Sequence, residues 1–224
     1  MQDRRLVRQF AMALFLAGVV GAAPAFANEI YSNLGSGDSY DSGSAYLIGQ
    51  ISIFNQVIGE SFVPSANFQF TDAQLALYSG GGTSTAVYLE SDNSGNPGSI
   101  LDTLAEQSSV VGLPGSVVQF DCTTCLSLTA GTEYWIVAAA GNGQTEWAYN
   151  DTGDNSGVDY TYSGSATPGS WSKNSTATRG AFEVDGTPLT TTVPEPDSVA
   201  LFGTGIAGLA LIHRRNRAQT INRG

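Results

Sequence analysis

Histidine and cysteine are almost missing from this chain of 224 residues, which contains one of the former and two of the latter. The histidine, His213, lies near the C-terminus, so the rest of the chain lacks the imidazole that Ser-His-Asp and Cys-His catalytic arrangements need. The two cysteines form one C-x-x-C motif, and no second pair completes a zinc site. These shortages exclude the common histidine-dependent hydrolases and zinc modules.

Positive charge is also scarce, because nine Lys and Arg residues face 20 Asp and Glu residues. Only Lys173 and Arg179 lie between Asn28 and Val193, a span that holds 17 of the acids and so has a net charge of −15. Phosphate backbones and anionic lipid surfaces repel a body of this charge. We therefore expect no nucleic-acid partner.

The body of the chain has no helical periodicity and no internal repeat, which argues against a coiled coil, a propeller or a solenoid. Segments of period-two alternation are separated instead by loops rich in Gly, Ser, Asn and Asp. This pattern predicts an all-β fold, a single antiparallel β-sandwich of jelly-roll type, over residues 28–190. The expected strands are Tyr46–Phe54, Gln56–Val63, Phe68–Tyr78, Ala86–Glu90, Val117–Asp121, Tyr134–Ala139, Glu146–Tyr149, Asp159–Tyr162 and Gly180–Val184.

Three segments carry sharper expectations. Both faces of Tyr134–Ala139 are apolar, which is typical of a central strand. In Phe68–Tyr78 the apolar residues change from even to odd positions, so we expect a bulge or bend near Thr71-Asp72. Leu101–Gln107 is compatible with one turn of helix or with a strand, and Asn96-Pro97-Gly98 predicts a tight turn.

The first 27 residues have the three parts of a secretory signal peptide. Arg4, Arg5 and Arg8 precede the apolar segment Phe10–Ala23, and Ala25-Phe26-Ala27 forms an A-x-A cleavage site. Signal peptidase is expected to cut after Ala27, the alternative being an uncleaved N-terminal anchor.

The C-terminal residues 191–224 form a linker and a second targeting segment. Pro194, Glu195 and Pro196 precede the apolar run 198–212, which is expected to be a short membrane helix of 15 residues. A comfortable membrane span needs about 20 residues. The basic cluster Arg214, Arg215 and Arg217 is expected to stay cytoplasmic, so the body faces outward and is held only transiently in the inner membrane.

This tail resembles the PEP-CTERM sorting signal of exported proteins of Gram-negative bacteria. The resemblance implies recognition by an exosortase, cleavage near Pro194-Glu195-Pro196, and association with exopolysaccharide-producing, biofilm-forming cells. Asp197 departs mildly from the family pattern, in which a small residue often follows the second proline. The alternative is an ordinary single-pass anchor.

The body shows a second likeness, over roughly residues 56–183. The string V-Y-L-E-S-D-N-S-G-N-P-G-S-I-L and the later L-T-A-G-T-E-Y-W resemble the choice-of-anchor β-sandwich domains of exported bacterial proteins. No enzymatic role follows from this resemblance.

Few residues of the body are candidates for a disulfide or a metal site. Export into an oxidising compartment favours a disulfide between Cys122 and Cys125. Asp92, Asp151 and Asp154 lie in Asn/Asp-rich loops that could hold Ca²⁺, although such loops are common without metal. No other cofactor is expected.

Late aromatic residues raise the possibility of glycan binding. Trp147, Tyr149 and Trp171 could stack on sugar rings, and Trp171, in a polar loop, is expected to be the most exposed. Glu133 and Glu146 are the candidates for a carboxylate pair in a glycosidase. The leading hypothesis is a non-enzymatic surface or matrix protein, followed by a carbohydrate-binding module and then by a secreted glycosidase.

Overall fold

The computed structural model describes residues 28–51, 54–163 and 170–189. Within them the chain forms strands, and all strand pairs are antiparallel. The strands are β1 (Asn28–Ser32), β2 (Asp41–Ile51), β3 (Phe54–Phe62), β4 (Phe68–Ser79), β5 (Ser84–Asp92), β6 (Pro97–Thr103), β7 (Ala105–Glu106), β8 (Ser116–Asp121), β9 (Ser127–Leu128), β10 (Tyr134–Asn142), β11 (Thr145–Tyr149), β12 (Val158–Ser163), β13 (Ser172–Asn174) and β14 (Phe182–Pro188).

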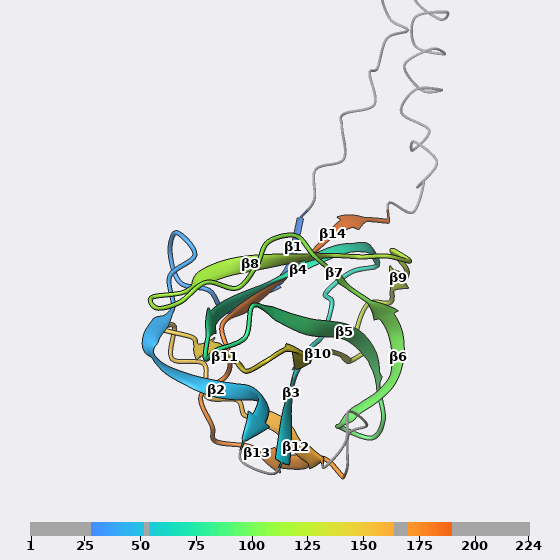
Figure 1. The fold of residues 1–224 in the computed structure, drawn as a ribbon. Coiled ribbons are helices and arrows are strands. Elements are labelled where there is room, and N and C mark those ends of the chain that lie inside the picture. The colour runs from blue at the N-terminus through green and yellow to red at the C-terminus, as the bar shows by residue number, and fades with distance from the viewer. Residues whose placement is uncertain (1–27, 52–53, 164–169, 190–224) are drawn as a thin grey trace, which may run out of the picture. The chain divides into compact units, whose positions relative to one another are not determined.

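The strands fall into two hydrogen-bonded groups that share β2 (Figure 1). In the first group β4 is flanked by β14 and β8, β1 extends β14, and β11 joins β4 to β2. In the second group β3 lies between β10 and β12, and β10 leads on to β5 and β6. The body as far as Pro188 is one compact unit.

The inward faces of both groups meet in one apolar core. Phe70, Leu75 and Phe120 come from the first group, and Ile58 and Ile136 come from the second. All five side chains are almost fully withdrawn from water, and burial of this kind is the main source of stability in a β-fold. The prediction of an all-β, antiparallel body is therefore confirmed, while the sandwich architecture and its jelly-roll connectivity stay predictions.

Two local expectations are confirmed by the strand register. β10 pairs with both β3 and β5, so it is the central strand that its two apolar faces predicted. Along β4, Asp185 pairs with Asp72 but the next residue, Gly186, pairs with Phe70, which leaves Thr71 as the extra residue of a bulge. The bulge lets Phe70 and Leu75 face the same core.

Other boundaries were predicted less well. Leu101–Gln107 forms the end of β6 and then β7, so the helical alternative is wrong. The expected turn at Asn96-Pro97-Gly98 lies earlier, because Ser94 and Gly95 have the positive φ angles of 60° and 80°, and Pro97 already begins β6. The short strands β1, β9 and β13 were not predicted, since two to five residues carry too little alternation to be recognised.

The two targeting segments lie outside the described residues. This applies to the signal peptide 1–27, to the Pro194-Glu195-Pro196 motif and to the apolar run 198–212 with its arginine cluster. Over the parts of the chain that the structure describes, there is no helix long and apolar enough to cross a membrane.

Candidate functional site

An apolar cluster lies on the outer face of the second strand group, on the side away from the core. Its buried members are Val57 of β3 and Trp135 and Val137 of β10, and the partly buried Tyr88 of β5 and Trp171 pack against them. We call these five residues the aromatic surface. They share one face because side chains alternate along each strand, so Ile136 points into the core while its neighbours point outward.

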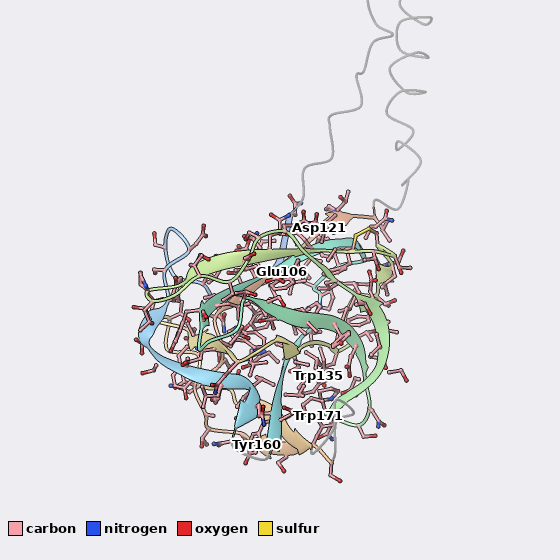
Figure 2. All side chains as sticks on the ribbon, in the orientation of Figure 1. Glu106, Asp121, Trp135, Tyr160 and Trp171 are labelled. Atoms are coloured by element: carbon pink, nitrogen blue, oxygen red, sulfur yellow. A yellow bond between two sulfur atoms is a disulfide. The ribbon has the colours of Figure 1, made fainter. Side chains whose placement is uncertain are left out.

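A glycine shapes this surface. A Cβ atom at Gly59 would lie 2.7 Å from Cγ of Pro97 and 3.5 Å from ring atoms of both Trp135 and Trp171. The missing side chain thus leaves the space that the two indoles and the proline fill. Figure 2 shows Trp135 and Trp171 close together in the lower part of the body.

Polar contacts hold the buried indole in place. Nε1 of Trp135 donates a 3.1 Å hydrogen bond to Oδ1 of Asp92, which also accepts from the Gly95 N–H at 2.9 Å. Nζ of Lys173 lies 5.7 Å from the centroid of the Trp135 ring, within reach of a cation–π interaction. Lys173 pairs in register with Asp159 of β12, which in turn pairs with Gly59.

Solvent reaches the members of the surface unequally. Trp135 is 1% exposed, whereas Trp171 and Tyr88 are each partly exposed. Ile100 of β6, opposite Glu90 in the register, is 56% exposed at the margin. The residues of this face that a ligand can reach are therefore Trp171, Tyr88 and Ile100.

The structure corrects two expectations about glycan contacts. Trp147 is fully buried, and its Nε1 donates to the Ala181 carbonyl at 2.9 Å, so its prediction as a sugar contact is wrong. Trp171 is not an open loop residue, because its side chain packs against the buried Val57, Trp135 and Val137. Tyr149 lies on β11 in the first strand group and stacks on Tyr46 at 4.7 Å, so the structure does not bring it to Trp171.

The cysteine pair forms a tied turn. A disulfide joins Cys122 to Cys125. Asp102 of β6 accepts hydrogen bonds from the N–H groups of Thr123 and Thr124, at 3.0 and 2.9 Å, and from the Thr123 hydroxyl. Burial raises the pKa of Asp102, but these donors outweigh it and hold the pKa below its ordinary value. The turn thus fixes the end of β8 to β6.

Two of the three candidate calcium ligands, Asp154 and Asp92, accept hydrogen bonds from other residues of the protein. Asp154 accepts a 2.9 Å hydrogen bond from the Tyr31 hydroxyl and one of 3.0 Å from the Ser156 N–H. Asp92 accepts the hydrogen bond from Nε1 of Trp135, and Asp151 is exposed. Within residues 28–51, 54–163 and 170–189, no three His, Cys, Asp or Glu side chains are grouped so as to hold a metal ion.

The two carboxylates proposed for a glycosidase are not brought together. Glu133 precedes β10, whereas Glu146 follows the far end of that strand, on β11. The nine residues of β10, which span roughly 30 Å at about 3.3 Å per residue, lie between them. Catalytic carboxylate pairs of glycosidases are about 5–10 Å apart, so these two residues cannot act on one glycosidic bond.

A buried ion pair, which the sequence did not predict, connects the two strand groups. Nε of Arg179 lies 2.7 Å from Oε2 of Glu60, and both side chains are almost completely buried. Oε1 of Glu60 accepts the Gly180 N–H at 2.8 Å, while Arg179 donates to the Tyr31 hydroxyl at 3.0 Å and to the Ser61 carbonyl. Burial raises the pKa of Glu60, and the guanidinium and the Gly180 N–H oppose that rise.

The first strand group has an acidic row on its outer face. Asp121 pairs with Asp72, Asp72 with Asp185, and Asp185 with Glu29, so four carboxylates cross β8, β4, β14 and β1. Asp121 is labelled in the upper part of Figure 2. Like charges opposite one another on a sheet destabilise it. Burial raises the pKa of Asp72, and its two acidic neighbours raise it further.

Two glutamates outside this row, Glu183 and Glu90, should make the domain more stable in mild acid. Burial, and then Asp185, raises the pKa of Glu183 to about 7, and burial raises the pKa of Glu90 to about 7. A raised pKa means that the folded state binds protons more tightly, so stability rises as the pH falls from 8 through 7 towards about 4.5, the ordinary carboxyl value. Because Glu183 is partly exposed and screened by salt, we expect a melting temperature higher by about 2–4 °C at pH 5 than at pH 8.

Thermal unfolding at the two pH values checks this. Glu183→Gln should raise the melting temperature at pH 8 and change it little at pH 5, which reduces the difference. Asp151→Asn, which removes an exposed carboxylate away from this cluster, is the control. Equal melting temperatures of the unmodified protein at pH 5 and pH 8 would contradict the prediction.

Comparison with known protein families gives a match in the C-terminal segment of the chain. Residues 192–215 match the PEP-CTERM protein-sorting motif. The matched range contains Pro194, Glu195 and Pro196 and the first two arginines of the basic cluster. No curated protein matches the chain, and the likeness of the body to choice-of-anchor domains stays a prediction. The chain carries a PEP-CTERM sorting signal, which indicates export and exosortase-dependent sorting to the cell surface.

Proposed function

We propose that the protein is a non-enzymatic component of the cell surface or extracellular matrix, delivered by its sorting tail and associated with exopolysaccharide in a biofilm. The observation that carries the proposal is the sorting motif at residues 192–215. The body is then the mature part, a β-sandwich module that signal peptidase and exosortase free from its two targeting segments. Neither calcium nor another cofactor is needed for this role.

The properties of the body support a passive rather than a catalytic role. Its best-connected polar group, the Glu60–Arg179 pair, has its hydrogen-bonding groups turned to protein partners. The carboxylates suggested for glycoside hydrolysis lie beyond opposite ends of β10, Glu133 before it and Glu146 on β11. A disulfide and a large apolar core suit a domain that must persist outside the cell.

The tail has the physical properties of a temporary anchor. Its apolar run of residues 198–212 is shorter than the roughly 20 residues of a comfortable membrane span, and arginines follow it. Such a segment could hold the chain in the inner membrane until an exosortase cuts near Pro194-Glu195-Pro196. Release would then leave the acidic body outside.

The mass of the mature protein tests the sorting proposal. Intact-mass analysis of protein recovered from the surface of the producing cells should find a chain that begins after Ala27 and lacks everything after about Pro196. A variant with Pro194, Glu195 and Pro196 all changed to alanine should keep residues 197–224 and stay in the membrane fraction. Recovery of the unaltered protein with its arginine cluster still attached would refute exosortase processing.

A further inference from the structure

We propose that the aromatic surface binds uncharged polysaccharide, with the Trp171 indole stacking on a sugar ring. This deepens the proposed function, on which it rests, by naming what the body contacts at the cell surface. The inference stands on three features of the described residues: a Trp171 side chain packed against a buried cluster but left partly exposed, the polar groups on the same strand face, and the charge of the body.

The position of the Trp171 ring is fixed from below. The side chain packs against the cluster of Val57, Trp135 and Val137, and its Cζ3 atom lies 3.5 Å from the position that a Cβ atom of Gly59 would take. The residue directly precedes β13, which is paired with β12. An aromatic ring that is already ordered loses little conformational entropy when a ligand stacks on it. The partly exposed ring is therefore a preorganised apolar platform.

Hydrogen-bonding groups lie beside Trp171 and farther along the outer face of the second strand group. Lys173, on the same face of β13 as Trp171, offers ammonium donors, and Thr103 of β6 is exposed in the same register row as Tyr88. Asn93, exposed in the loop that leads to Pro97, adds an amide. Sugars present apolar ring faces together with hydroxyl groups, so a strand face that offers an indole together with hydroxyl, amide and ammonium groups matches the chemistry of an extended glycan.

The charge of the body favours an uncharged polymer. With 17 acids against two basic residues between Asn28 and Val193, the body repels polyanions such as acidic polysaccharides. Arg179 is buried in its ion pair, and Lys173 lies over Trp135 and opposite Asp159 in the register. Neither residue is placed to reverse that repulsion over a long anionic chain, whereas an uncharged glycan is not repelled.

The size of the exposed apolar area argues against a protein partner. A stable protein interface buries about 800 Å² on each side and has an apolar centre. On this face the buried Trp135 and Val137 offer almost no area, and exposed apolar area comes from Ile100 and from portions of Trp171, Tyr88 and Ala139. One stacked ring and a few hydroxyl contacts suit a sugar better.

Affinity electrophoresis of the exported protein tests the site. Native gels would contain hydroxyethylcellulose, dextran or galactomannan as uncharged probes and alginate as the acidic probe. We expect retardation by at least one uncharged polymer and none by alginate. Trp171→Ala should weaken the affinity at least tenfold, Trp171→Phe should retain part of it, and Tyr149→Ala, which removes a partly exposed ring from the other strand group, should leave it unchanged.

A spectroscopic readout covers the case in which Trp171→Ala does not fold. Incorporation of 5-fluorotryptophan gives a ¹⁹F resonance for each of the three tryptophans, Trp135, Trp147 and Trp171. The resonance of Trp171, assigned from Trp171→Phe, should move most when the retarding polysaccharide is added. That of Trp147, which is buried in the core, should stay in place.

Four results would overturn the proposal: no retardation by any uncharged polymer, stronger retardation by alginate, unchanged binding in folded Trp171→Ala, or a Trp171 resonance that does not respond. These failures are separable from failure of the sorting proposal. A protein that loses its tail normally but is not retarded refutes the glycan site alone. Retardation of a protein that keeps its tail refutes the sorting step alone.

Discussion

Replacing Arg179 with methionine should lower the free energy of unfolding by about 3–5 kcal/mol, one of the largest effects of a single substitution in this domain. The reason is the partner left behind. Glu60 is 0% exposed and would keep a carboxyl group in the core without its guanidinium, whose Nε now lies 2.7 Å away. The substitution would also leave the Tyr31 hydroxyl and the Ser61 carbonyl without the donor they share.

Urea unfolding of single and double variants measures the effect. Glu60→Met should be destabilised to a comparable degree, because it leaves the guanidinium buried and alone. The double variant Glu60→Met/Arg179→Met should recover much of the loss, since replacing both partners with apolar side chains of similar volume removes the uncompensated charge. If the two single losses simply add in the double variant, the pair is not the coupled unit that the geometry describes.

The sequence predicted the parts of this fold that depend on local pattern. The two apolar faces of β10 and the change of parity in β4 were visible because neighbouring side chains in a strand point to opposite faces. The contact between Glu60 and Arg179 was not, because 119 residues separate the partners. The only local sign was Arg179 itself, one of two basic residues in an acidic span.

In the candidate site, too, contacts between residues that are distant in the sequence could not be predicted. Trp171 lies among Gly, Ser and Asn residues, which indicated an exposed loop, but pairing of β13 with β12 brings its ring onto Gly59 and Trp135. Trp147 lies in a short strand in which Ala148 is buried as well, so alternation alone could not assign its face. Both placements depend on which distant strand lies beneath the ring, and one sequence does not contain that information.

Trp147→Ala should also cost about 3–5 kcal/mol, the range for large aromatic residues removed from a core. The indole is 0% exposed, meets Phe182 edge-on at 5.8 Å between ring centroids, and donates its N–H to the Ala181 carbonyl at 2.9 Å. Its removal leaves a cavity beneath β14 and an unpaired carbonyl. In a domain of this size the melting temperature should fall by roughly 10 °C.

The glycine beneath this indole makes a complementary test. A Cβ atom at Gly180 would lie 2.7 Å from Cε2 and Nε1 of Trp147, so Gly180→Ala should force the ring or the backbone to move. The backbone N–H of Gly180 holds Glu60 at 2.8 Å, and displacement would therefore weaken the buried ion pair as well. We expect Trp147→Ala to relieve that clash, so the double variant should be less destabilised than the sum of the single variants.

Thermal unfolding of Trp147→Ala and Trp171→Ala tests the core role of Trp147. Because Trp171 is partly exposed, its replacement should lower the melting temperature less than the replacement of Trp147 does. Equal melting temperatures for Trp147→Ala and Trp171→Ala would mean that Trp147 does not have the core role its burial indicates.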